Sequence, residues 1–142
     1  MDSLAVCLQQ VSYRWHPQQP QVLDIPELSI SAGERVFLYG ASGSGKSTLL
    51  NLLAGILRPQ SGSVEVFGTD LTALRGAARD RFRAENIGVI YQQFNLLPYL
   101  SVAANIELAV HFGGGRGGAA GIDELLQQLR DVYGRDKVSL VY

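Results

Sequence analysis

The chain has 142 residues, 46% of them apolar and 18% charged, which fits one soluble globular domain with a hydrophobic core. A formal net charge of -1, without a basic stripe, argues against a nucleic-acid partner. The sequence has no run of about 18 apolar residues and no positively charged leader, so neither a membrane span nor a signal peptide is predicted; the lone Cys7 suits a reducing cytosol.

The segment ahead of residue 40 predicts a small β layer. Residues 4–11 and 22–30 read as strands, and the polar loop of residues 16–21 between them contains prolines and glutamines typical of a turn. Trp15, the only tryptophan, stands just after the first strand. An indole there could stack on a nucleotide base, but a tryptophan more often packs in the core or at its rim, so both interpretations stay open at this point.

Residues 40–47 read GASGSGKS and match the phosphate-loop pattern G-x-x-x-x-G-K-[ST] at every required position. Small residues let successive backbone N–H groups surround a phosphate, and the following helix points its positive end at the same oxygens. Lys46 is placed to reach the outer phosphates, while the Ser47 hydroxyl is a natural Mg²⁺ ligand. The motif therefore predicts a site for a nucleoside triphosphate.

The residues on either side give this motif its expected context. Residues 35–39 (RVFLY) predict a short buried strand, and residues 47–54 (STLLNLLA) predict an apolar helix closed by Gly55. A strand, a glycine loop and a helix in this order distinguish a phosphate site from a chance match in a chain with 16 glycines. The later glycine tract, residues 113–121, has neither a lysine nor a preceding strand and is predicted to be a linker.

Past the loop helix, residues 62–68 alternate as a half-exposed strand, and residues 71–85 predict a helix. The arginines of that helix lie among acidic residues, which indicates a solvated face rather than a phosphate-binding patch. These arginines are Arg75, Arg79, Arg81 and Arg83. Residues 87–91 (IGVIY) then predict a short buried strand, and a polar amide follows it at Gln92, where ligands collect in open α/β sheets.

The next segment, residues 94–100 (FNLLPYL), is a loop by its Asn and Pro but carries many apolar side chains. It could fold back as a satellite core cluster or form an exposed patch for a partner protein, and the residues alone favour neither. Ser101 is a good N-cap for a helix over residues 102–112. Residues 123–133 predict an amphipathic helix, and the tail of residues 135–142 is short and β-prone.

With these residues in view, the sequence resembles the ATP-binding subunits of ABC transporters up to about Tyr133. The similarity lies in GASGSGKS, in LLNLLAGILRPQSGSVEVFGTDL and in IGVIYQQFNLLPYLSVAANI, and it is closest to the lipoprotein-export and macrolide-export branch. It implies an α/β P-loop NTPase core of the ABC ATPase type with a flanking antiparallel β layer. Residues 1–93 would be a partial core, residues 94–134 the start of a helical subdomain containing the linker, and residues 135–142 an unassigned tail.

The resemblance also implies roles for single residues. By position, Trp15 matches the aromatic that stacks on the adenine of ATP, and Gln92 matches the glutamine that contacts Mg²⁺ and the attacking water, with Gln93 as its competitor. Lys46 and Gln92 are the implied catalytic residues, and Ser47 and Gln92 the implied metal ligands. The remaining implied nucleotide-binding residues are Gly40, Ala41, Ser42, Gly43, Ser44, Gly45 and Thr48.

Partners follow from the same resemblance. Residues 94–100 would dock against a transmembrane permease subunit, which would hold the chain at the cytoplasmic side of the inner membrane. ATPase domains of the family also work as dimers. The expected function is ATP binding and hydrolysis coupled to export or release of a lipoprotein-like or hydrophobic cargo.

The sequence departs from the family after its glutamine loop. It contains no LSGGQ signature, no apolar strand ending in Asp, no following catalytic Glu, and no switch His, because His111 comes too early. A chain truncated at its C-terminal side is the expectation. The alternatives are a non-catalytic nucleotide-binding remnant, which the missing motifs favour, and a small P-loop phosphotransferase, which the early β layer disfavours.

Overall fold

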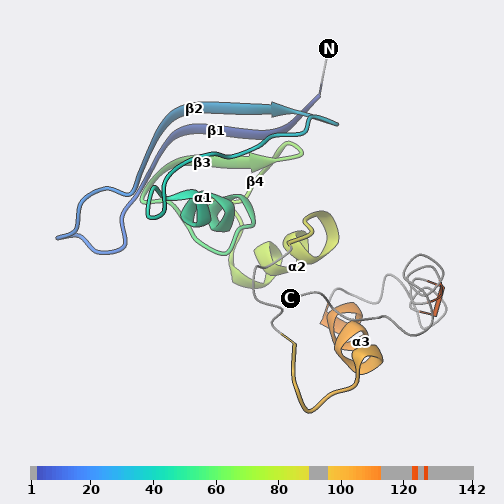
Figure 1. Ribbon diagram of the computed structural model, residues 1–142. Coiled ribbons are helices and arrows are strands. Elements are labelled where there is room, and N and C mark those ends of the chain that lie inside the picture. The colour runs from blue at the N-terminus through green and yellow to red at the C-terminus, as the bar shows by residue number, and fades with distance from the viewer. Residues whose placement is uncertain (1–2, 90–95, 113–122, 125–126, 128–142) are drawn as a thin grey trace. The chain divides into compact units, whose positions relative to one another are not determined.

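A computed structural model of the chain describes residues 3–89, 96–112, 123–124 and 127. The chain divides into two units, Met1–Ile87 and Gly88–Tyr142 (Figure 1). The second unit contains α3, Val102–Phe112. The elements of the first unit are β1 (Leu4–Tyr13), β2 (Leu23–Ser31), α1 (Lys46–Leu53), β3 (Ser61–Val66), β4 (Thr69–Asp70) and α2 (Gly76–Asn86).

The strands of the first unit form one antiparallel sheet in the order β2-β1-β3-β4. β3 and β4 are joined by a tight turn at Phe67 and Gly68, whose φ angles of 48° and 73° are those of a type I′ hairpin. Figure 1 shows α1 lying along one face of this sheet, where it contacts β3. The antiparallel β layer predicted from the sequence is confirmed.

β1 changes its alternation in mid-strand. Leu8, Val11 and Tyr13 are all buried in one core, although strict alternation would place Leu8 and Val11 on opposite faces. A bulge at Gln10, with φ of 50°, causes the change, and the β1–β3 register shifts across it. Gly62 of β3 lies so close to the carbonyl oxygen of Gln10 that no Cβ would fit. The bulge brings Tyr13 to the core side at the end of the strand.

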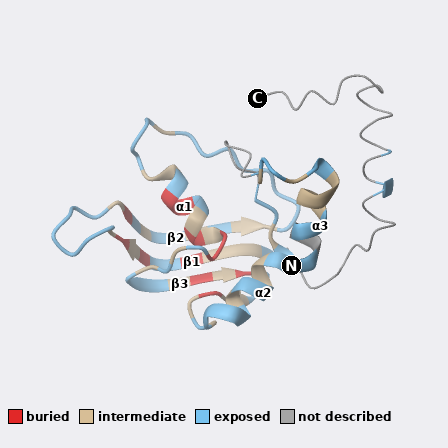
Figure 2. Ribbon diagram, turned by 90° about the horizontal axis from the view of Figure 1, so that it is seen from below, coloured by how far each residue is buried: buried red, intermediate tan, exposed pale blue. Residues whose placement is uncertain are grey.

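The core lies between the sheet and α1, where buried residues are coloured red in Figure 2. Leu52 of α1 and Leu8 of β1 are almost wholly excluded from solvent, and burying a side chain of this size contributes about 1.5–3 kcal/mol. The buried members of this cluster are Leu8, Val11, Tyr13, Leu23, Leu49, Leu52, Val64, Val66 and Leu71. α1 is therefore fixed by its own apolar side, and the loop that precedes it is attached to a packed element.

The prediction of a buried strand at residues 35–39 is wrong for this structure. These residues form no strand, and the side chains of Phe37 and Tyr39 are 87% and 88% exposed. A central parallel strand needs hydrogen-bonded neighbours on both sides, and no strand of the described residues pairs with this segment. The described part of the predicted strand 87–91, residues 87–89, is also irregular, for the same reason.

The helix predicted over residues 71–85 begins later, at Gly76. The Asp70 carboxylate accepts hydrogen bonds from the backbone N–H and the hydroxyl of Thr72, which stabilises a turn in place of the first helical turn. The predicted α3 is confirmed, as is its N-cap, because the Ser101 hydroxyl accepts the N–H of Ala104 at 3.1 Å. Of the helix predicted over residues 123–133, only Asp123, Glu124 and Gln127 are described, and they are helical. The linker 113–121 and the tail 135–142 lie outside the described residues.

Candidate phosphate-binding site

The phosphate loop leads directly into α1, which begins at Lys46. Gly45 is the N-cap of this helix with φ of 93°, and Gly43 has φ of 80°. Such left-handed backbone costs an L-residue about 1–2 kcal/mol and costs glycine almost nothing. The first N–H groups of a helix have no intrahelical partner, and Gly45 has no side chain with which to cap them. The motif's glycines thus stand where the loop curls and where the helix offers donors to an anion.

Position 45 favours glycine because its φ is positive and because a Cβ there would be crowded by neighbouring residues. A Cβ at this position would lie 2.9 Å from the Leu23 side chain and 3.2 Å from the carbonyl oxygen of Val22. Leu23 is the first residue of β2 and Val22 directly precedes it, so the phosphate loop passes close to the start of β2. By contrast, a Cβ at Gly43 would meet nothing within 4 Å. The tight approach at Gly45 fixes the last turn of the loop against the sheet.

Lys46 turns its side chain back over the loop. Its Nζ donates hydrogen bonds to the carbonyl oxygens of Gly40 at 2.5 Å and Ala41 at 2.6 Å, and to the Ser44 hydroxyl at 3.2 Å. The ammonium group therefore lies at the centre of residues 40–45 and closes them into a ring. An ammonium group in this position can also donate to a phosphate, because charged phosphate oxygens accept stronger hydrogen bonds than neutral carbonyls do.

The other residues of the motif differ in exposure. Ser47, on the first turn of α1, is exposed, so its hydroxyl is available to a metal ion. Thr48 is only 5% exposed and lies with the core side of the helix. Ala41 and Ser42 are exposed. The structure thus brings together residues 40–48, whereas Gln92 and Gln93 lie outside the described residues.

Trp15 lies just beyond the end of β1 and is 52% exposed. Its ring meets the ring of buried Tyr13 edge to face, with centroids 5.2 Å apart and planes at 88°. Edge-to-face pairs of this kind contribute about 0.5–1.5 kcal/mol beyond area burial. Trp15 is therefore a rim residue: one part of the indole packs on the core aromatic, and the rest is open to solvent.

In the second unit, the described part of the predicted docking loop, residues 96–100, is partly exposed. Tyr99 is 78% exposed and Leu96 45%, while Leu97 is half-buried. Asn105 organises this segment: its side chain accepts the N–H of Leu97 at 2.8 Å and donates to the carbonyls of Leu97, Leu100 and Ser101. Sequence reasoning missed Asn105, although an Asn inside a helix was a signal, since its side chain competes for backbone groups.

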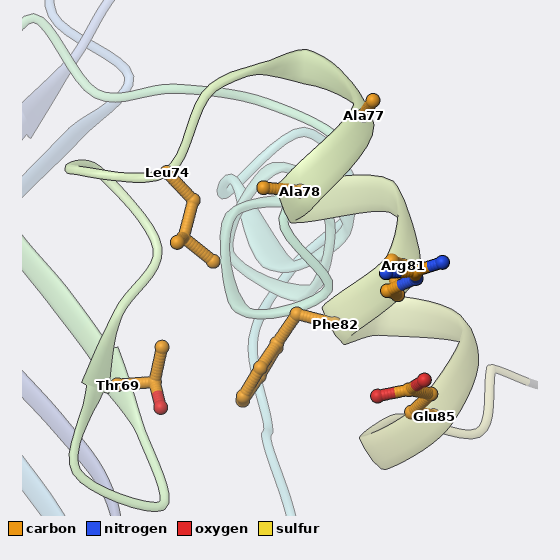
Figure 3. Close-up of a pocket in the computed structure, with 7 residues that line it drawn as sticks. All are labelled: Thr69, Leu74, Ala77, Ala78, Arg81, Phe82 and Glu85. Carbon is orange, nitrogen blue, oxygen red and sulfur yellow. The ribbon is translucent and has the colours of Figure 1, made fainter.

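A separate hollow of about 580 Å³ lies beside α2 and shares no residue with the phosphate loop (Figure 3). Figure 3 shows Phe82 extending from α2 toward Thr69 of β4. The residues that line this hollow are Thr69, Leu74, Ala77, Ala78, Arg81, Phe82 and Glu85.

The sequence predicts that the arginines of this helix form a solvated face, and the structure departs from this prediction at Arg79. Arg83 pairs with Asp80 at 2.9 Å. Arg79, however, packs against Gly55, and its Nε and Nη1 are buried with no hydrogen-bond partner among the described residues.

Within the part of the chain that the structure describes, no helix is long and apolar enough to cross a lipid bilayer. Among the same residues, no group of three or more His, Cys, Asp or Glu side chains is arranged to hold a metal ion.

Comparison with known families gives one clear match. The model of the family described as ABC transporter matches residues 23–140, which is most of the chain. The lipoprotein-releasing system ATP-binding protein LolD of Chromohalobacter salexigens is 47% identical over 96 residues, covering 68% of this chain and 40% of that protein. The macrolide export ATP-binding/permease protein MacB 2 of Aeromonas hydrophila is 42% identical over 102 residues, covering 72% of this chain and 16% of that protein. The chain thus spans less than half the length of these relatives.

Solved structures show the same likeness. The dimeric structure of MJ0796, a bacterial ABC transporter cassette, superposes with a TM-score of 0.76 at 32% identity, covering 88% of this chain and 56% of that one. A dimeric MJ0796 structure bound to ADP and Pi superposes with a TM-score of 0.75. The P-loop ATPase fold expected from the sequence is confirmed.

Proposed function

This chain belongs to the ABC transporter family, and from that premise we propose that it is an ATP-binding component which binds ATP with Mg²⁺ at residues 40–48. The observation that carries the proposal is the loop geometry: glycines at left-handed φ, an uncapped helix start, and an ammonium group at the centre. In this proposal Lys46 exchanges its carbonyl partners for phosphate oxygens, and the first-turn N–H groups of α1 face the same phosphates. Bound Mg²⁺ would neutralise phosphate charge, with Ser47 as the ligand that this chain supplies.

Trp15 is proposed to hold the adenine. A base stacked on an aromatic side chain is stabilised by about 1–3 kcal/mol, and the exposed part of this indole offers such a surface. Its contact with Tyr13 limits the orientations that the ring can take. Gln92, with Gln93 as the alternative, remains proposed as the residue that orients the attacking water and contacts the metal.

The membrane role is a further part of the proposal. The LolD relative is named for lipoprotein release and the MacB relative for macrolide export, so we extend a lipoprotein-like or hydrophobic cargo to this chain. Residues 94–100 would contact a permease subunit, and the exposure of Tyr99 supports this. The MJ0796 cassettes are dimeric, and pairing with a second ATPase domain is proposed here too.

A docking role for this loop predicts that Tyr99→Glu weakens copurification with a coexpressed permease. Nucleotide affinity should stay unchanged, because Tyr99 is not among the residues proposed to bind ATP. Leu97→Glu should act likewise but carries a risk of unfolding, since Leu97 is half-buried and bonded to Asn105. Undiminished copurification of a folded Tyr99→Glu variant would argue that the loop is a local cluster instead.

The direct test of nucleotide binding is a calorimetric titration of the 142-residue chain with ATP and Mg²⁺, followed in parallel by the emission of its single tryptophan. We expect saturable binding and a change in Trp15 emission. Binding without a change in emission would remove Trp15 from the site and leave the phosphate loop in it. A chain that binds no nucleotide would contradict the proposal.

A further inference from the structure

Gln60 lies directly before β3 and extends its pairing with β1 by means of a side chain. Its backbone N–H donates to the carbonyl oxygen of Ser12 at 3.0 Å, where the β1–β3 ladder ends. Its side chain then continues the ladder: Oε1 accepts the backbone N–H of Arg14 at 2.8 Å, and Nε2 donates to the backbone carbonyl of Arg14 at 2.7 Å. One primary amide thus makes the paired exchange that a peptide group makes in an antiparallel sheet.

Arg14 is the residue between Tyr13 and Trp15. Both of its backbone polar groups are held by Gln60, so the peptide that carries Trp15 is fixed although it lies outside the strand. Tyr13, the residue before Arg14, is buried, and its carbonyl accepts the N–H of Val22 at 2.8 Å. The two residues before Trp15 are therefore held by backbone hydrogen bonds, Tyr13 to Val22 and Arg14 to Gln60.

We infer that Gln60 is a positioning residue for the nucleotide base: its side-chain amide fixes the backbone of Arg14 so that Trp15 presents its ring in one place. The inference rests on the proposed role of Trp15. Without the amide, the backbone before Trp15 is free to move, and binding must then order it. Ordering one residue's backbone costs about 1–2 kcal/mol, which corresponds to a roughly 5- to 30-fold loss of affinity.

The side chain's length and chemistry can be tested separately. Gln60→Ala removes both hydrogen bonds, and Gln60→Asn keeps the amide but shortens it by one carbon, so that it does not reach Arg14. Gln60→Glu keeps an acceptor for the Arg14 N–H but loses the donor to the Arg14 carbonyl. Gln9→Ala is the matched control, because Gln9 is an exposed glutamine of β1 whose side chain makes no hydrogen bond in the described part of the chain.

The experiment titrates each full-length variant with two probes, ATP with Mg²⁺ and inorganic triphosphate with Mg²⁺, and records calorimetry and tryptophan emission. Triphosphate has no base, so it reports on the phosphate loop alone. We expect Gln60→Ala and Gln60→Asn to bind ATP 5- to 30-fold more weakly, with a smaller emission change, and to bind triphosphate as the wild type does. Gln60→Glu should lie between, and Gln9→Ala should match the wild type.

Each other result counts against the inference. ATP affinity and emission that stay unchanged in Gln60→Ala would overturn it, while leaving the proposed role of Trp15 intact. Equal weakening of ATP and triphosphate would mean that Gln60 supports the fold as a whole and has no special part in holding the base. A wild-type chain that binds ATP with silent Trp15 emission would remove the proposed role of Trp15, and the inference with it.

Discussion

The Nζ atom of Lys46 lies 2.6 Å from the carbonyl oxygen of Ala41, so the ammonium group is hydrogen-bonded within the loop that it belongs to. The same atom also reaches the carbonyl oxygen of Gly40 and the hydroxyl of Ser44. These hydrogen bonds hold the loop together, and in the proposed binding a phosphate would replace these acceptors. Lys46 therefore has two roles, one in the structure of the loop and one in the proposed binding of ATP.

The Lys46→Ala variant should lose ATP affinity by roughly 10- to 100-fold, because a hydrogen bond to a charged group contributes about 1.5–3 kcal/mol. Isothermal titration with ATP and Mg²⁺ measures the change. Since Lys46 also closes the loop, the far-UV circular dichroism spectrum and the unfolding midpoint are needed as controls for folding. A folded Lys46→Ala variant with wild-type affinity would show that the phosphates bind elsewhere.

The two left-handed glycines of the loop should respond differently to alanine. Gly43→Ala meets only the conformational cost of positive φ, about 1–2 kcal/mol, because a Cβ there has open space. Gly45→Ala meets the same cost and also collides with the Leu23 side chain and the Val22 carbonyl. Urea unfolding should therefore show the larger loss of stability for Gly45→Ala. Equal losses would mean that the close approach of the loop to β2 is relaxed in solution.

The attachment of α1 to the sheet predicts a contrast between two leucines of the same helix. Leu52 is 1% exposed and Leu50 is 57% exposed. Leu52→Ala should lower the free energy of unfolding by about 2–5 kcal/mol, as expected for a buried leucine, and Leu50→Ala should change it little. Denaturant titrations of both variants measure this. Comparable losses would show that Leu50 packs against other side chains in solution, contrary to its exposure in this structure.

The local elements of this fold could be predicted from the sequence, because their signals are local. The alternation of residues 62–68 indicated β3, Ser101 indicated the start of α3, and GASGSGKS indicated the loop. The strand prediction for residues 35–39 is wrong because a buried parallel strand depends on neighbouring strands. Without such neighbours the same apolar run is exposed.

Long-range hydrogen bonds made by single side chains could not be predicted. Gln60 and Arg14 are far apart in sequence. No local sequence pattern indicates that a glutamine amide extends the pairing of β1 with β3. The bulge at Gln10 was equally hidden, although the spacing of Leu8 and Val11 breaks the alternation of a strand. Such features decide how Trp15 is held, so the site's precision depends on tertiary contacts that the motif does not describe.

The 142-residue polypeptide is predicted to bind ATP without hydrolysing it at the rate of a full-length cassette. Phosphoryl transfer to water depends on positioning and charge stabilisation, which require the metal to be held from two sides and the water to be oriented. Lys46 and Ser47 supply one side. The sequence has no LSGGQ to offer a second ATPase domain, and no apolar strand ending in Asp with a following Glu.

Phosphate release from ATP with Mg²⁺ by the purified chain is the measurement, with Lys46→Ala as the control for contaminating ATPases. Wild type and Lys46→Ala should release phosphate equally slowly, although only the wild type binds ATP well. Adding a full-length cassette relative as a partner tests the physical argument further. The partner's LSGGQ could face an ATP bound at this chain's phosphate loop. The chain would still lack an Asp and a Glu of its own at that site. The partner hydrolyses ATP by itself, so we expect the same rate of phosphate release from its mixtures with wild type and with Lys46→Ala. Lys46-dependent hydrolysis at a rate comparable to the relative's would show that other residues of this chain supply the missing groups.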